Sequence, residues 1–176
     1  KQSKKNKIRP VFAISPGLKG NKSTAHYRKF LAIKIKQAKR LGFEEFAIFF
    51  DDIDHKRDEG LARKHLEILE LVLSFNIPAN DLWVCPTVYC KSFAKGSLKD
   101  NKYLKTLARD IDPEVKILWT GDEVVSESIK SKGIVEFKGL FSNPIVIWDN
   151  YYANDYCPSR YFIGSYQKRG GIKNQV

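Results

Sequence analysis

Short apolar runs alternate along the chain with stretches of helical periodicity. The runs lie at residues 11–14, 46–50, 82–85, 117–119 and 145–148. Each is continuous and bounded by polar residues, a pattern typical of strands buried in a parallel sheet. Between the runs, apolar residues recur with the period of an amphipathic helix. We therefore expect helices near residues 24–41, 58–75, 103–111 and 128–141.

The alternation of strands and helices predicts an α/β fold of parallel βαβ units. Every predicted strand ends in a polar or aromatic residue: Ser15, Asp51, Tyr89, Thr120 and Asn150. Functional groups at the C-terminal ends of successive parallel strands are typical of TIM-barrel enzymes. A doubly wound sheet is the alternative, but it usually carries a glycine-rich phosphate loop after its first strand. The segment Ser15–Leu18 is not such a loop.

The chain is short for a closed barrel, which needs eight strands and typically about 250 residues. With 176 residues, we expect an incomplete (β/α) barrel, about strands three to seven, in one partial catalytic domain over residues 1–176. Residues 151–176 are expected to be mostly loop. An open barrel exposes two edge strands, and formation of a homo-oligomer is one way to cover them.

The formal net charge is +11, with basic residues gathered at both ends and on the helix near residues 24–41. A nucleic-acid-binding surface would need a basic face with exposed aromatic residues, or a known motif. Neither a zinc-finger spacing nor a ribonucleoprotein motif is present. We attribute the charge to solvated surfaces and expect no nucleic-acid partner.

Neither the 3 cysteines nor the 3 histidines show metal-ligand spacing, and an odd, sparse cysteine count does not indicate a disulfide framework. We expect no metal site and no cofactor. No apolar run approaches the roughly 20 residues of a membrane span. No signal peptide is visible at Lys1, which is uninformative if an N-terminal part is missing. The compartment is left open, with the cytoplasm favoured.

Asp51 and Asp52 directly follow the most apolar run. Successive strand residues point to opposite sides, so these carboxylates can titrate differently, as a general acid beside a charge stabiliser requires. Alternatively, both are solvated loop acids, with Asp54 or Asp58 capping the next helix. A magnesium site formed by Asp51, Asp52 and Asp54 is a third interpretation, but the phosphate loop expected beside it is absent.

Short motifs occur at each predicted strand end: Phe12–Gly17, Phe49–Ile53, Cys85–Tyr89, Trp119–Asp122, and Ile147–Asn150 followed by Ala153–Tyr156. Together and in this order they resemble glycoside hydrolase family 84, which comprises O-GlcNAcases and related, partly hyaluronidase-like β-N-acetylglucosaminidases. The resemblance covers about Ile8 to Tyr166. It implies a retaining hydrolase that removes terminal β-linked N-acetylglucosamine from a glycan or glycoprotein. In this substrate-assisted reaction, the acetamide oxygen of the sugar attacks the anomeric carbon and forms an oxazoline.

The resemblance also implies individual roles. Asp51 would orient and polarise the acetamide N–H, and Asp52 would be the general acid and base. Tyr89 would donate to the acetamide oxygen, while Asn150 would hold the acetamide and its partner aspartate. Asp155 would accept hydrogen bonds from the sugar hydroxyls. Asn150 and Asp155 have an alternative interpretation, in which each bonds its own loop.

Four further residues are implied near the acetyl group. Trp148, Cys85 and Val124 would line the acetyl pocket, and Thr120 would lie near it. Core packing alone also explains an aromatic residue at Trp148 and a small buried thiol at Cys85, and Thr120 could simply close a turn. Val88 stands where many family members carry glutamate. Family segments that contact the sugar before the first and after the last of these strands are missing, so a catalytically weak or inactive glycan- or glycopeptide-binding module is the alternative function.

Overall fold

The computed structural model describes residues 2–16, 24–51, 53, 57–153, 159, 161, 164–165 and 167–169. Within this part of the chain, a 5-stranded parallel sheet has the order β1-β2-β3-β4-β5. Its strands are β1 (Val11–Ile14), β2 (Glu45–Phe49), β3 (Leu82–Cys85), β4 (Lys116–Trp119) and β5 (Ile145–Ile147). They coincide with the predicted apolar runs or differ by a terminal residue. The predicted α/β fold of a partial TIM-type barrel is thereby confirmed.

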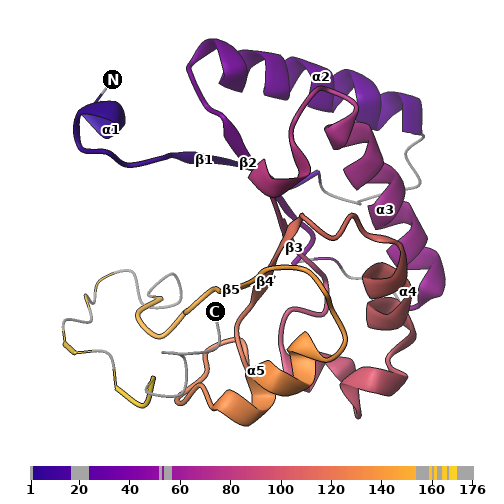
Figure 1. Cartoon of the computed structure of the whole chain (residues 1–176), viewed down its shortest axis with the longest axis vertical. Helices are drawn as coiled ribbons and strands as arrows, with labels where there is room; N and C mark the ends of the chain where they lie inside the picture. Colours follow the sequence, from indigo (N-terminus) through magenta and orange to yellow (C-terminus); the bar gives the residue numbers. More distant parts are fainter. Residues whose placement is uncertain are drawn as a thin grey trace.

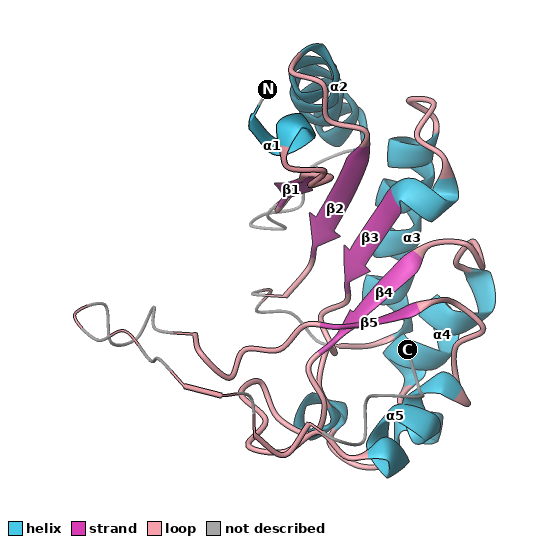
Figure 2. Cartoon of the chain, turned by 60° about the vertical axis from the view of Figure 1, so that its left-hand side comes forward, coloured by secondary structure: helices cyan, strands magenta, loops and turns pink. Residues whose placement is uncertain are grey.

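Helices pack against one face of this sheet. α2 (Thr24–Arg40), α3 (Glu59–Leu73) and α4 (Lys102–Asp110) follow the first three strands and lie side by side (Figure 1). The rotated view shows the strands in front of these helices (Figure 2). Asp58, one of the two residues that the sequence offered as a cap, is the N-cap of α3, and its carboxylate accepts the backbone N–H of Leu61 at 3.1 Å.

The prediction of a helix over residues 128–141 is wrong at both ends. α5 spans Ser131–Lys138, and Gly139 is its C-cap. On the N-terminal side, the backbone N–H of Ile129 donates to the carbonyl of Lys168 at 3.2 Å. This bond to a residue distant in sequence holds the preceding segment outside the helix. The short elements α1 (Gln2–Lys5), η1 (Ala79–Asp81), η2 (Lys91–Ala94) and η3 (Leu98–Asp100) were not predicted.

The main core lies between the sheet and the helices. Alternate residues of β2 and its extension, Phe46, Ile48 and Phe50, are fully buried there. Leu31 of α2 and Leu107 of α4 belong to the same cluster and are also fully buried. Burying one such side chain contributes about 1.5–3 kcal/mol. The helix-covered face is therefore the main source of hydrophobic stabilisation in the described chain.

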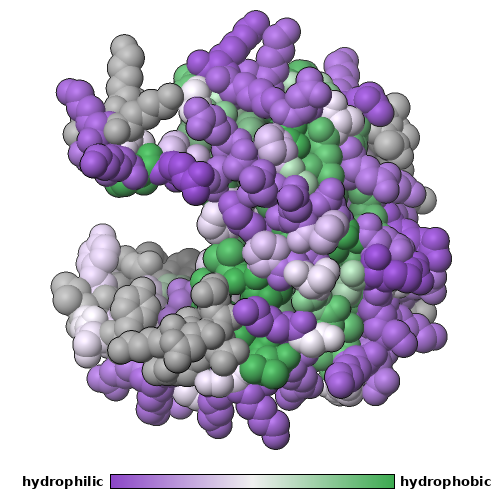
Figure 3. Space-filling view, viewed as in Figure 1, coloured by the Kyte–Doolittle hydropathy of each residue, from purple (hydrophilic) through white to green (hydrophobic). Residues whose placement is uncertain are grey.

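The opposite face of the sheet is the side that becomes the interior of a closed barrel. Phe49 pairs with Cys85, and Leu118 pairs with Val146, so one row of side chains crosses the sheet. These residues pack in a second, smaller apolar cluster. In the space-filling view, hydrophobic surface is visible on the concave side of the molecule, with hydrophilic residues beside it (Figure 3).

This inner face becomes polar toward the N-terminal ends of the strands. The indole N–H of Trp83 donates to the carboxylate of Glu45 at 2.8 Å. Glu45 also lies 3.0 Å from Arg9 and 3.8 Å from Lys116, although its side chain is only 4% exposed. The inner face is thus charged at the N-terminal ends of the strands and apolar toward their C-terminal ends. The candidate site lies at these C-terminal ends.

Candidate active site at the C-terminal ends of the strands

Backbone hydrogen bonds extend the sheet beyond its regular strands and bring the strand ends together. The N–H of Phe50 donates to the carbonyl of Cys85 at 2.8 Å, and that of Trp148 donates to Trp119 at 2.9 Å. Asp51 follows Phe50 directly and is half-buried. The predicted catalytic residue Asp52 and the predicted sugar-binding residue Asp155 lie outside the described residues.

Tyr89 is held by both its backbone and its ring. Its carbonyl accepts the backbone N–H of Thr120 at 2.9 Å. The ring is 6% exposed and lies 5.8 Å from the Trp148 ring and 5.1 Å from the Phe93 ring, centroid to centroid. Aromatic rings at these separations attract one another beyond their shared buried area. The side chain therefore has one preferred placement beside Trp148.

Trp148 connects the apolar inner face to the strand ends. Its ring lies 5.3 Å from that of Phe49, and both pack on the cluster formed by Cys85, Tyr89, Cys90 and Leu118. The residue remains half-buried. Core packing is thus part of what Trp148 does, and the remaining surface of the side chain is available to form a wall of the site.

Val124 and Asn150 are brought together from different loops. The side-chain amide of Asn150 donates to the carbonyl of Val124 at 3.1 Å. Val124 packs on the same cluster as Trp148 and Cys85, and Cys85 is completely buried. The structure therefore gathers Cys85, Tyr89, Val124, Trp148 and Asn150 in one region.

Thr120 is 1% exposed, and its hydroxyl donates to the carbonyl of Glu123 at 2.7 Å. It closes the turn after β4, as one of the two sequence interpretations proposed. Gly121 follows with φ +102, and a Cβ at that residue would lie 2.8 Å from the hydroxyl oxygen of Ser126. Only glycine fits this turn without strain, because other residues rarely adopt a positive φ.

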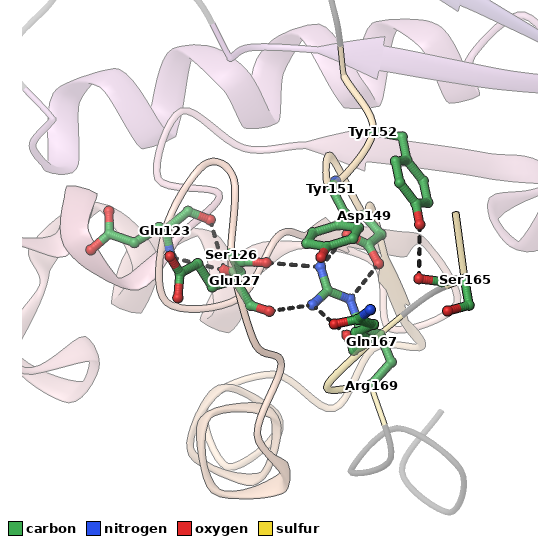
Figure 4. Close-up of polar contacts among 9 residues, drawn as sticks. All are labelled: Glu123, Ser126, Glu127, Asp149, Tyr151, Tyr152, Ser165, Gln167 and Arg169. Carbon is green, nitrogen blue, oxygen red and sulfur yellow. Dashed lines mark hydrogen bonds and ion pairs between the residues drawn. The ribbon is translucent and has the colours of Figure 1, made fainter. Parts of the chain in front are cut away.

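Arg169 is a residue that the sequence analysis counted only as charge. Its Nε and Nη2 donate to the two carboxylate oxygens of Asp149 at 2.8 and 2.9 Å (Figure 4). The hydrogen bonds from Arg169, and one from the backbone N–H of Tyr151, hold the pKa of Asp149 below its usual value. Asp149 immediately precedes Asn150, so the ion pair fixes the segment that carries this amide.

The same guanidinium reaches the loop between β4 and α5. It donates to the carbonyl of Ser126 at 2.8 Å and to that of Glu127 at 2.7 Å. Its carbon lies 4.4 Å from the centre of the Tyr151 ring, a cation–π contact. Arg169 therefore links both loops that hold the Val124–Asn150 contact. No local sequence pattern identifies it, since its partners Asp149, Glu127 and Ser126 lie 20, 42 and 43 residues earlier.

Asp52 and Asp54 of the alternative magnesium site lie outside the described residues. Within the described ranges, no group of three or more His, Cys, Asp or Glu residues is arranged to hold a metal ion. Burial raises the pKa of the Cys90 thiol, which opposes nucleophilic activity near neutral pH. Among the described helices, none combines the length and apolarity needed to cross a membrane.

A family model described as beta-N-acetylglucosaminidase matches residues 1–176. The protein O-GlcNAcase of Rattus norvegicus is 34% identical over 166 residues, which is 90% of this chain and 18% of that protein. The Mus musculus protein O-GlcNAcase is 33% identical, with the same coverage of 90% and 18%. The chain therefore spans less than a fifth of these curated relatives.

Solved structures with the same fold are also similar to this chain. An O-GlcNAc hydrolase of Thermobaculum terrenum, in a mutant form, superposes with a TM-score of 0.78 at 27% identity, covering 96% of this chain and 38% of that one. The structure of CpGH84B superposes with a TM-score of 0.75 at 23% identity, covering 95% and 30%. The latter likeness concerns the fold alone.

Proposed function

This chain belongs to the β-N-acetylglucosaminidases of glycoside hydrolase family 84, and we propose that it removes terminal β-linked N-acetylglucosamine from a glycan or glycoprotein. The observation that carries the proposal is the cluster at the strand ends, where Tyr89 and Trp148 pack beside the Val124–Asn150 contact. Asp51 emerges at the same edge of the sheet. An apolar wall beside a carboxylate and hydrogen-bonding side chains suits an acetamide group, which has a methyl and two polar ends.

The proposed reaction is substrate-assisted and retains the anomeric configuration. The acetamide oxygen of the sugar attacks the anomeric carbon while the glycosidic bond breaks, and Asp52 gives its proton to the leaving oxygen. Asp51 accepts the acetamide N–H and stabilises the positive charge that develops on the oxazoline. Asp52 then takes a proton from water, whose oxygen opens the oxazoline at the anomeric carbon.

The surroundings of Asp51 support this division of roles. Asp51 is a half-buried residue two positions after Phe49, which packs on the apolar cluster, and charge–charge interactions in a partly buried place are stronger than in bulk water. Tyr89 would donate its phenolic proton toward the acetamide oxygen, and Asn150 would hold the acetamide from the neighbouring strand end. Cys85, Val124 and Trp148 would enclose the methyl group, with Thr120 fixing the turn behind them.

Hydrolysis of a fluorogenic N-acetyl-β-glucosaminide tests the proposal on the 176-residue chain and on the complete product of its gene. We expect Asp51→Asn and Asp52→Asn each to lower kcat by about 10²–10⁴-fold, the range for a charge stabiliser or general acid. Asp110→Asn, an exposed acid at the far end of α4, is the matched control and should leave kcat unchanged. Full activity in both site variants would overturn the mechanism, and binding of N-acetylglucosamine without turnover would replace hydrolysis by a binding function.

A further inference from the structure

A closed ring of polar and aromatic contacts lies behind the candidate site. The hydroxyl of Thr87 donates to the carbonyl of Phe50 at 2.6 Å, and its backbone N–H donates to the phenol oxygen of Tyr103 at 3.0 Å. That phenol oxygen lies 2.9 Å from Nδ1 of His65. The His65 ring stacks on the Phe50 ring, with centroids 3.8 Å apart and planes 5° from parallel. The ring of contacts thus returns to the residue where it began.

All four residues are 0% exposed. The phenol oxygen of Tyr103 accepts the backbone N–H of Thr87 and lies within hydrogen-bond distance of Nδ1 of His65. Burial raises the pKa of Tyr103, which keeps the phenol protonated as a donor. The phenol oxygen is therefore held between the backbone of Thr87 and the ring of His65.

Burying such a network costs more free energy than filling the same space with apolar side chains. Each buried hydroxyl and imidazole gives up hydration that apolar side chains would not need to lose. The surrounding positions of α3 and α4, such as Leu66, Leu69 and Leu107, are apolar. A buried polar network whose members bond to backbone groups does, however, favour one arrangement of that backbone. Its placement shows which backbone is selected.

The selected backbone is the one that enters the site. Phe50 immediately precedes Asp51, and Thr87 lies two residues before Tyr89. Both backbone polar groups of Phe50 are held, since its N–H donates to Cys85 at 2.8 Å and its carbonyl accepts from Thr87 at 2.6 Å. Both partners come from β3 or the loop that follows it. The network therefore joins the C-terminal end of β2, which leads into Asp51, to the C-terminal end of β3, which leads toward Tyr89.

We infer that His65, Tyr103 and Thr87 are positioning residues, which fix the backbone of Asp51 relative to Tyr89. This inference rests on the proposed function, in which the two residues contact opposite ends of one acetamide group. That group is small and rigid, so both contacts are made only when the two strand ends keep their spacing. A misplacement of about 1 Å in such a site costs roughly 10²-fold in rate.

Thr87 offers a matched pair of variants. Thr87→Val keeps the branched shape and removes the hydroxyl, whereas Thr87→Ser keeps the hydroxyl and removes a methyl group. We expect Thr87→Val and Tyr103→Phe to lower kcat on the fluorogenic substrate by about tenfold or more, with KM changing less than kcat. Thr87→Ser should recover most of the lost kcat. All measurements use the complete gene product.

Asn143→Leu supplies the control for general loss of stability. Asn143 is 3% exposed and donates to the carbonyls of Asp112 and Val115 at 2.7 and 2.9 Å, before β4 and far from the strand ends of the site. This variant should lose thermal stability and keep kcat. A purely structural role for the Thr87 network would give Thr87→Val and Tyr103→Phe this same behaviour.

Amide hydrogen exchange gives a readout that does not need catalysis. The N–H of Phe50 bonds to Cys85, and that of Ile53 bonds to the carbonyl of Asp51 at 2.9 Å. We expect Thr87→Val, but not Thr87→Ser, to speed exchange at both amides relative to that of Ile117. If the unmodified protein hydrolyses no substrate, the proposed function fails. The amide exchange rates still test whether the network holds the backbone around Asp51. Unchanged exchange in Thr87→Val and Tyr103→Phe, or unchanged kcat in an active protein, overturns the inference.

Discussion

Replacing Arg169 by methionine tests how strongly one guanidinium holds the end of β5. The variant keeps a long side chain but removes the charge and all its N–H donors. The side chain of Arg169 is 10% exposed and that of Asp149 is 17% exposed. Asp149 would therefore lose its cation in a place where water replaces it poorly.

The expected cost follows from that burial. Removing one partner of a fully buried ion pair costs about 3–5 kcal/mol. Asp149 keeps the backbone N–H of Tyr151 at 3.1 Å and has some contact with solvent. We therefore expect Arg169→Met to lower the free energy of unfolding by about 2–3 kcal/mol.

Urea denaturation at pH 7, followed by tryptophan fluorescence, measures this loss. A double-mutant cycle with Asp149→Asn should give a coupling energy of about 1–2 kcal/mol, because the two side chains are in direct contact. Arg109→Met is the matched control. Arg109 also pairs with an aspartate, Asp110, but these side chains are 61% and 38% exposed, so its loss should matter much less.

The pH dependence gives a second check on the same ion pair. Hydrogen bonds from Arg169 lower the pKa of Asp149 in the folded protein. Its stabilising contribution is then complete above the unfolded-state pKa of about 3.9 and is lost as pH falls through the folded-state pKa. The stability gap between the unmodified protein and Arg169→Met should narrow below about pH 4. A coupling energy under ~0.5 kcal/mol at pH 7, or a gap that widens in acid, would refute the reasoning.

Two further outcomes test local features of the fold. Asn101→Ala removes the side-chain oxygen that accepts the N–H of Leu104 at 3.0 Å as the cap of α4, and it should cost about 1 kcal/mol in thermal unfolding; an unchanged melting temperature contradicts this. Burial raises the pKa of Cys90, so at pH 8 iodoacetamide should modify it far more slowly in the folded protein than in urea, as measured by mass spectrometry of the peptide. Equal rates would show that the thiol is accessible.

Local sequence pattern predicts the strands and most helices, because each of them buries one side in the core between the sheet and the helices. A short apolar run such as residues 46–50 has few alternatives to a buried strand. Asp58 is a recognisable N-cap, since its carboxylate acts on an N–H only three residues later. The start of α5 was predicted wrongly because Ile129 bonds to Lys168, a contact between segments that local periodicity does not relate.

The candidate site also has a part that the sequence predicts and a part that only the structure shows. Motifs at the strand ends identified Asp51, Tyr89 and Asn150 as candidates, because parallel strands bring their C-terminal ends to one edge. Side-chain contacts such as those of Asn150 with Val124, or of Tyr89 with Trp148, depend on how neighbouring loops meet.

By itself, the sequence determined the order of strands and helices, the parallel sheet and the family, since these depend on local pattern and on motifs that can be compared one by one. Only the tertiary structure decided that Arg169 holds Asp149 and that Thr87, Tyr103 and His65 form a closed ring with Phe50. Contacting members of that ring are 15 to 38 residues apart in the sequence. Hydrogen-bond direction and ring stacking between such distant residues arise from packing, which no periodicity along the chain encodes.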